Sequence, residues 1–437
     1  MESTRPRLVR HVHLGLLGDT GGWIWDSSHQ QLVKAGPDLK TRVWRSDGPI
    51  DSEPLELMRG TAGVLFVPDF HAEGRWIAVP SNAGLAMWSL GRSYPHILRH
   101  HTQVVYGLAF SPDGDWIASS SMDFTLRLWP LDGTPLPPGR VLLGPDDRKQ
   151  KLDLAVSPDG QKLLVGTGGP GAPQLVNLGS GSARVLPGFD SQVWSVAFSP
   201  SGRLAAAVGG EWEPRERLIR VWDVASGDEL AVLGPEEDLR PLGLEFLDEH
   251  HVLSGGDSGL RRWDLRTGRS VMVRGGHIHF FAIDNNRRRV ILTEGKGENA
   301  GQPNKALVLD LDSEATTPLA THGDRIRSVA LDASGDVVVT GDLDGIIRVG
   351  PVTGDEPHLL IGHERSVEVL AVDPLGRWIA SGSEDTTVRL WPMPDLSKPP
   401  LHTLPREELI AKLKTLTNLR VVRDPESATG WKLTHDP

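Results

Sequence analysis

An internal repeat constrains this fold more than any other feature of the sequence. The stretch that begins at His101, HTQVVYGLAFSPDGDWIASSSMDFTLRLWPLDG, closely matches the one that begins at His363, HERSVEVLAVDPLGRWIASGSEDTTVRLWPMPD. Each contains an apolar strand, a turn rich in Pro, Asp and Gly, a second apolar strand, a tight turn with Asp, and a third strand that ends in Arg-x-Trp. A repeat of this kind predicts an array of structural units that share one fold.

The third strand of the unit can be traced nine times along the chain. Its last position is occupied by Trp44, Trp88, Trp129, Val176, Trp222, Trp263, Leu309, Gly350 and Trp391, at steps of 44, 41, 47, 46, 41, 46, 41 and 41 residues. The turn between the first two strands recurs as SPDG at Ser111 and Ser157, SPSG at Ser199, DASG at Asp332 and DPLG at Asp373. Pro and Gly supply the backbone angles of a tight reversal, so the strands are expected to be antiparallel.

With this period and these motifs the chain resembles the WD-repeat family, whose blades have four strands in about 40 to 45 residues. The resemblance implies an all-β fold, a single β-propeller. It also implies a hydrogen-bonded lock in each blade, formed by a His, a Ser or Thr, an Asp and the Trp. The residues that match this lock are His101, Ser119, Asp123 and Trp129; His363, Ser381, Asp385 and Trp391; and, without the Trp, His322, Thr340 and Asp344.

The repeats predict one propeller domain over residues 7–404, with nine blades. Two alternatives stay open, because propellers usually close with four to eight blades: eight blades with one decayed copy, or seven with two copies left over. The ring needs a closing strand that removes its free edges. The segment RLVRHVHLG at Arg7 resembles the outer strand before each His, as in HLLIGH at His358, and LHTL at Leu401 competes with it.

Residues 405–437 depart from the repeat and predict a short α/β tail. Pro405 and two Glu open a helix with Leu409, Ile410, Leu413 and Leu416 on one side, and NLRVV and GWKL read as two strands. The tail resembles the end of the WD-repeat regions in bacterial proteins that carry a serine/threonine kinase domain. The resemblance implies a sensor or scaffold half with an associated kinase domain, although no kinase motif is present here.

Composition excludes several kinds of function. The sequence has no cysteine, so thiolate catalysis and cysteine-ligated metals are excluded. The net charge is −11, which opposes binding to nucleic acid. No apolar run is long enough for a membrane helix, and the N-terminus lacks the pattern of a signal peptide. We therefore expect a cytoplasmic protein, a monomer, without cofactor or membrane association.

Four motifs suggest chemistry but fit the repeat better. Gly166, Gly168 and Gly171 spell a dinucleotide-binding loop, but a strand follows where a helix is needed. The tetrapeptide GDSG at Gly256 occupies the tight turn of a blade, and no triad can be assigned to it. His277 and His279 could present two imidazoles to a metal, but Gly-His is a repeat position, which favours a structural His277. Asp342 and Asp344 lack the other ligands of a calcium loop.

Two long insertions are the candidate partner-binding features. The segment GGEWEPRERLI places Trp212 among charged residues, and Trp and Arg dominate binding hot spots. A second insertion, GKGENAGQPNKA at Gly295, replaces the same turn two repeats later, so both should lie on one face. The candidate residues are Trp212, Glu213, Arg215, Arg217, Lys296 and Lys305.

The leading hypothesis is a non-catalytic scaffold or sensor that binds protein or peptide partners in bacterial signalling. The alternatives are a propeller hydrolase or lyase with a site in the central channel, and a peptide- or glycan-reading module. An enzyme should carry convergent ionisable groups on the strands that line the channel. The segments YGLAF, SVAFS, SVALD and VLAVD are instead apolar and small, which favours the scaffold.

Overall fold

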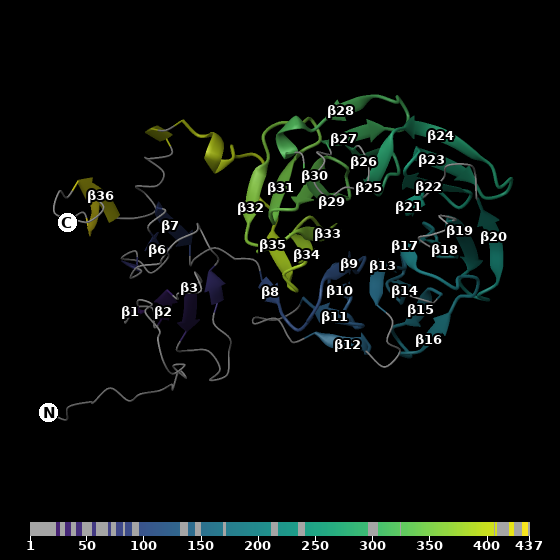
Figure 1. The fold of residues 1–437 in the computed structure, drawn as a ribbon, viewed down its shortest axis with the longest axis horizontal. Coiled ribbons are helices and arrows are strands. Elements are labelled where there is room, and N and C mark those ends of the chain that lie inside the picture. The colour runs from purple at the N-terminus through teal and green to yellow at the C-terminus, as the bar shows by residue number, and fades with distance from the viewer. Residues whose placement is uncertain are drawn as a thin grey trace. The chain divides into compact units, whose positions relative to one another are not determined.

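The computed structural model describes a ring of seven four-stranded sheets (Figure 1). The structure describes residues 96–405 and 407–408, and also strands on either side of this range. The segments within the range that are not described are 132–138, 145–149, 169–171, 211–216, 235–240, 296–304 and 324. The chain divides into two compact units, Pro95–Pro400 and a second one made of Met1–Tyr94 with Leu401–Pro437. Each unit is described by itself.

The ring in the first unit has seven blades. In chain order they are β9 (Val105–Phe110), β10 (Trp116–Ser121), β11 (Leu126–Pro130) and β12 (Arg140–Leu143); β13 (Lys151–Val156), β14 (Lys162–Thr167), β15 (Gln174–Asn177) and β16 (Ala183–Val185); β17 (Val193–Phe198), β18 (Leu204–Gly210), β19 (Arg217–Asp223) and β20 (Glu229–Leu233); β21 (Pro241–Phe246), β22 (His251–Gly256), β23 (Gly259–Asp264) and β24 (Ser270–Gly275); β25 (His277–Ile283), β26 (Arg289–Gly295), β27 (Lys305–Asp310) and β28 (Thr316–Pro318); β29 (Ile326–Leu331), β30 (Val337–Asp342), β31 (Ile346–Pro351) and β32 (His358–Ile361); β33 (Val367–Val372), β34 (Trp378–Ser383), β35 (Val388–Pro392) and β8 (His96–Leu98).

The predicted count of nine blades, and its alternative of eight, are wrong. The copies that end at Trp44 and Trp88 belong to the second unit. There, β1 (Trp23–Asp26), β2 (Gln31–Ala35), β3 (Thr41–Arg45) and β4 (Leu55–Leu57) form one sheet, and β5 (Asp69–Phe70), β6 (Trp76–Ser81) and β7 (Gly84–Ser89) form another. The ring therefore spans residues 96–392, less than the predicted 7–404.

The strand that closes the ring is β8, and neither predicted candidate does so. β8 pairs antiparallel with β35, with Leu98 opposite Val388 and His96 opposite Leu390. The candidate at Arg7 lies outside the described residues, and Leu401–Thr403 forms the short 3-10 helix η3. Because β8 precedes the first blade in the chain, the last blade is completed by the opposite end of the ring, which removes its free edge.

The predicted α/β character of the tail is not borne out. Of the expected helix, the structure describes only Glu407 and Glu408 as helical. β36 (Leu419–Arg423) and β37 (Trp431–His435) form an antiparallel pair, with Leu419 opposite His435. Apart from these two helical residues and the 3-10 turns η2 (Ala320–His322) and η3, the described elements are strands, so the class is all-β.

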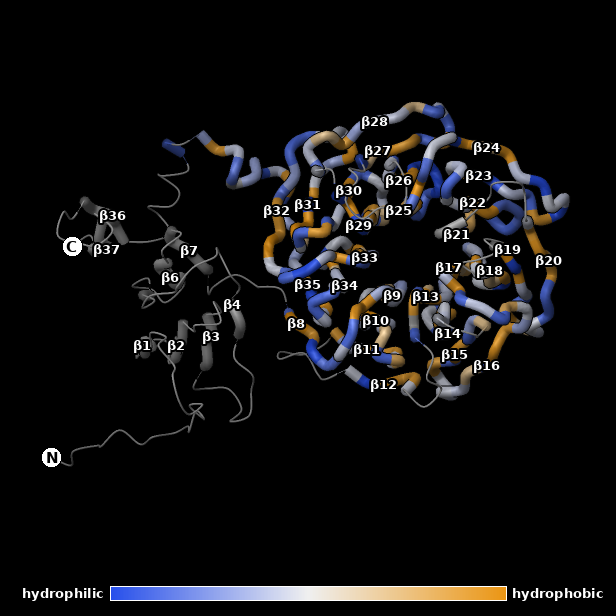
Figure 2. The backbone as a smooth tube through the Cα atoms, in the orientation of Figure 1, coloured by the Kyte–Doolittle hydropathy of each residue, from blue (hydrophilic) through white to orange (hydrophobic). Residues whose placement is uncertain are grey.

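The core of the ring lies between neighbouring blades, because each sheet has two apolar faces. The largest clusters join residues of adjacent sheets, for example Val208 and Val221 with Phe246 and Trp263. Figure 2 shows apolar residues along most strands and polar ones in the turns. The first strand of every blade lies innermost and contacts its counterparts in the two adjacent blades, so seven such strands surround a central channel.

Candidate functional site

Two blades contain the complete predicted lock. His101 Nδ1 lies 2.8 Å from Asp123 Oδ2, and its Nε2 lies 2.8 Å from Ser119 Oγ. The indole of Trp129 donates to the same Ser119 oxygen at 2.8 Å. In the last blade His363 lies 2.7 Å from Asp385 and 2.6 Å from Ser381, which also accepts from Trp391 at 2.8 Å.

The lock joins two loops that lie at the same end of a blade, and these loops define one face of the ring. His101 precedes the inner strand β9, and Asp123 lies in the turn between β10 and β11. We call the face that carries these connections the lock face. Burial would raise the pKa of Asp123, but hydrogen bonds from His101 and Thr125 hold it well below its ordinary value. The buried carboxylate is thus ionised and satisfied.

The lock of the sixth blade is incomplete. His322 Nδ1 lies 3.1 Å from Thr340 Oγ1, but Asp344 is turned to Arg325 at 3.2 Å. Gly350 stands where other blades have the Trp, and His322 Nε2 is buried without a hydrogen-bond partner. Asp342, the other acid of this turn, accepts from Arg348 at 2.6 Å. Both acids therefore face arginines, which is unsuitable for the calcium site considered from the sequence.

The remaining motifs behave as parts of the repeat. Gly166 and Gly168 lie at the end of β14, and a strand, β15, follows. Asp257 of the GDSG turn lies 3.1 Å from His277 Nδ1, so this pair links the fourth and fifth blades. The rings of His277 and His279 are 4.2 Å apart. No group of three potential metal ligands occurs among the residues that the structure describes.

The structure describes only two of the six candidate partner-binding residues. Trp212, Glu213, Arg215 and Lys296 lie outside the described residues. Arg217 begins β19, and Lys305 begins β27 and is exposed. The two insertions connect the second and third strands of their blades, like the turn that holds Asp123. The described strand ends that flank them, Gly210 with Arg217 and Gly295 with Lys305, lie at the lock face, and the position of the insertions themselves stays a prediction.

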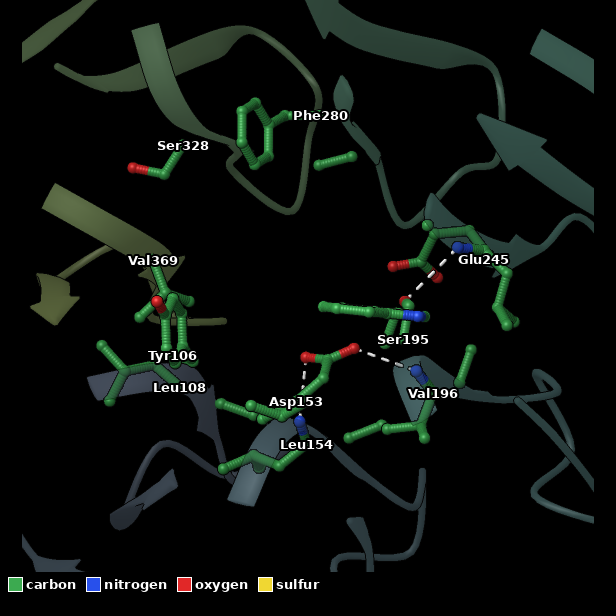
Figure 3. Close-up of a pocket in the computed structure, with 18 of the residues that line it drawn as sticks. Tyr106, Leu108, Asp153, Leu154, Ser195, Val196, Glu245, Phe280, Ser328 and Val369 are labelled. Atoms are coloured by element: carbon green, nitrogen blue, oxygen red, sulfur yellow. Dashed lines mark hydrogen bonds between the residues drawn. The ribbon is translucent and has the colours of Figure 1, made fainter. Parts of the chain in front are cut away.

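A cavity of about 880 Å³ occupies the channel, and all seven inner strands line it (Figure 3). Met122, Gln150 and Gln192 line it at the lock face, and Pro158, Ser199 and Arg287 at the opposite face. The cavity thus runs the length of the inner strands.

Ionisable side chains line this channel, which corrects the expectation that its strands are apolar and small. From the lock face inward they include Arg327 and Glu368, then Asp153, then Glu245 with Arg287. The four segments used for that expectation come from only four inner strands. Two other inner strands carry the carboxyl groups: Asp153 lies in KLDLAV of β13, and Glu245 lies in PLGLEF of β21.

The channel's charged groups are paired with the protein itself. Arg327 Nη2 donates to Glu368 at 2.9 Å, and Ser366 Oγ donates to the same carboxylate at 2.5 Å. Asp153 accepts the backbone N–H groups of Val196 at 2.9 Å and Leu154 at 2.8 Å (Figure 3). The contacts of Arg327 with Glu368 and of Asp153 with Val196 cross between blades, so these groups serve first as joints of the ring.

The lock-face mouth of the channel also gathers aromatic rings. Tyr106, Trp194, His279, Arg327 and Glu368 occupy the second or third position of their inner strands. Tyr106, Trp194 and Arg327 are all half-buried and line the cavity. We call these three residues the mouth cluster.

Comparison with known proteins finds similar repeats for four segments of the chain. Four segments match the family model "WD domain, G-beta repeat": residues 92–130, 181–223, 313–349 and 354–392. Each runs from the outer strand of one blade through three strands of the next, which is the offset by which β8 closes the ring. The fold is a seven-bladed β-propeller, and these four segments of it are similar to the WD repeat.

Three curated relatives are longer proteins from two fungi and from human. The nuclear distribution protein PAC1 of Coccidioides posadasii is 26% identical over 323 residues, which cover 72% of this chain and 62% of the relative. The nuclear distribution protein nudF of Aspergillus niger is 24% identical over 319 residues, covering 71% and 63%. Human striatin-3 is 25% identical over 330 residues, covering 68% and 35%. The chain therefore spans less than two thirds of the length of each of these relatives.

These relatives do not support the resemblance to bacterial kinase-associated proteins. They are fungal and human proteins. The associated kinase domain and the monomeric state stay predictions. In the described part of the chain, no helix combines the length and the hydrophobicity that crossing a membrane requires.

Proposed function

We propose that the ring is a non-catalytic protein-interaction module that binds a segment of a partner protein on its lock face. The observation that carries this proposal is the mouth cluster, because Tyr, Trp and Arg are the residue types that dominate binding hot spots. The three side chains lie half-buried at the rim of a cavity, where a partner residue could remove them from water. The likeness to PAC1, nudF and striatin-3 supports a scaffold role.

One observation favours a channel enzyme, since carboxyl groups with raised pKa values are frequent in active sites. Burial raises the pKa of Asp153 to about 6 and that of Glu245 to about 7. Against catalysis, Asp153 is held by backbone N–H groups, and the Ser195 hydroxyl beside it also accepts the Leu244 N–H at 3.3 Å, so both side chains hold neighbouring blades together. The scaffold therefore explains more of the geometry.

The test is affinity capture with paired variants from the native organism. Trp194→Ala should lose the partners that wild type captures, because the indole is the largest side chain of the mouth cluster. The matched control is Leu375→Ala, which removes a 61% exposed side chain from a turn on the opposite face. Trp212→Ala tests the insertion in parallel.

Partners lost with Trp194→Ala and kept with Leu375→Ala would support the lock face. Identical partner sets for wild type and Trp194→Ala, or loss with Leu375→Ala alone, would refute it. Absence of any specific partner, together with turnover of a small molecule that Glu245→Gln abolishes, would establish the enzyme instead.

A further inference from the structure

One position of the inner strands differs in a single blade. The penultimate residue of the inner strand is alanine in six blades: Ala109, Ala155, Ala197, Ala282, Ala330 and Ala371. In the fourth blade it is Glu245, which pairs with Leu253 just as Ala197 pairs with Ala206. The fold therefore requires only a methyl group at this position, and the carboxyl group of Glu245 needs another explanation.

Glu245 lies at the end of a chain of contacts that crosses two blade boundaries. Asp153 of the second blade accepts the Val196 N–H of the third, and it is also hydrogen-bonded to the Ser195 side chain. Ser195 Oγ in turn accepts the N–H of Leu244, the residue before Glu245 in the fourth blade. Figure 3 shows the carboxyl groups of Asp153 and Glu245 directed into the same part of the channel.

The charge of Glu245 is only weakly compensated. Its nearest cation is Arg287, whose Nη1 lies 3.7 Å away, longer than a hydrogen bond. Protein surrounds Glu245, although its side chain is still 37% exposed to the channel. Burial raises its pKa, Arg287 opposes that shift, and the negative charge of Asp153 adds to it.

Other titratable groups face the channel from the remaining blades. Arg327 and Glu368 neutralise each other at the lock face, and His279 lies there too. Burial raises the pKa of Tyr106 above its ordinary value, so the phenol stays neutral near pH 7. Among the described lining residues, Asp153 and Glu245 are thus the carboxyl groups without a hydrogen-bonded cation.

We propose that Asp153 and Glu245 form a pH-sensitive pair, which loosens the joints between the second, third and fourth blades when both carboxyl groups are ionised. A carboxyl group whose pKa is raised by folding stabilises the folded state while it is protonated. That stabilisation is present in acid and is lost as the pH rises through about 6 for Asp153 and about 7 for Glu245. The pair therefore couples the rigidity of one arc of the ring to pH near neutrality.

The test is hydrogen–deuterium exchange of the full chain at about pH 5 and about pH 8, corrected for the intrinsic exchange rates. Peptides that span β17 and β21 should lose protection at the higher pH relative to peptides that span β29, on the far side of the ring. Glu245→Ala installs the residue of the other six blades and should reduce this relative loss to the part that Asp153 contributes on its own. Glu245→Gln keeps the size of the side chain and should reduce the loss to the same extent.

The matched control is Glu314→Gln, which removes a carboxyl group from an exposed turn. It should leave the loss of protection unchanged. Equal protection of β17 and β21 at both pH values in wild type would overturn the proposal. It would also be overturned if Glu245→Ala and Glu245→Gln showed the same loss as wild type.

Discussion

At the scale of single residues, the locks concentrate several buried polar atoms on one hydroxyl group. Ser381 Oγ contacts both the Nε2 of His363 and the indole N–H of Trp391, and Ser381 is fully buried. A buried donor without an acceptor costs free energy, because water cannot replace the missing partner. The strength of each lock therefore depends on the central Ser or Thr.

Ser381→Ala should lower the free energy of unfolding by roughly 1 to 3 kcal/mol for each ring nitrogen that loses its partner. The measurement is urea-induced unfolding. Ser397→Ala is the matched control, because Ser397 is exposed and contacts only its own turn. An equal effect of the two substitutions would contradict the role assigned to the lock.

His322 is the residue whose lock is incomplete, and it gives the sixth blade a distinct response to acid. Its ring is fully buried, and burial lowers its pKa to about 4, with a further lowering by Arg348. Above about pH 6.5, the ordinary pKa of histidine, the ring is neutral in both the folded and the unfolded chain and does not change the free energy of unfolding. As the pH falls from there to about 4, the unfolded chain takes up the proton more readily, and stability is lost.

We expect wild type to lose roughly 3 kcal/mol more than His322→Gln between these pH values, as an upper estimate. The measurement is the urea midpoint of both proteins across that pH range. His358→Gln, on an outer strand of the same blade, should follow wild type. Parallel curves for wild type and His322→Gln would contradict the assignment.

At the scale of elements, the sequence predicts strands well and their grouping poorly. The lock residues His101, Ser119, Asp123 and Trp129 could be placed from the resemblance to the WD-repeat family, because each has a fixed position in its unit. The closing strand was missed although HILRH at His96 precedes His101 just as HLLIG at His358 precedes His363. If the copies that end at Trp44 and Trp88 are counted as blades of the ring, the segment at His96 becomes the fourth strand of the blade that ends at Trp88. It is then not available to close the ring.

The channel residues were missed for a different physical reason. Glu245 is the one residue of its inner strand that differs in kind from the equivalent residues of the other blades. A search for repeats relies on the positions at which the copies agree, so it passes over such a residue. Aligning GLAF, DLAV, SVAF and GLEF by their turns isolates the one glutamate in a column of alanine. Its contact with Arg287 could not be predicted, because the two residues are 42 positions apart and belong to different blades.

At the scale of the whole ring, the two complete locks belong to the first and last blades, which meet where the ring closes. Arg377 Nη2 of the last blade donates to the Gly114 carbonyl of the first at 2.8 Å. One apolar cluster joins Leu98 and Leu390 to Phe110 and Trp129 across the same boundary. The most regular repeats thus stabilise the only joint between blades that are distant in sequence.

The seven-bladed ring depends on its closure by β8. An engineered disulfide tests this closure, since the chain has no cysteine of its own. Ile97 lies opposite Arg389 in the closing pair. Under mild oxidation, Ile97→Cys combined with Arg389→Cys should form an intramolecular disulfide, identified by mass spectrometry of the linked peptides. The comparison is Val9→Cys with Arg389→Cys, in one of the two segments that the sequence offered as closing strands. A seven-bladed ring predicts linkage of the first pair alone; linkage of the second pair alone would contradict it.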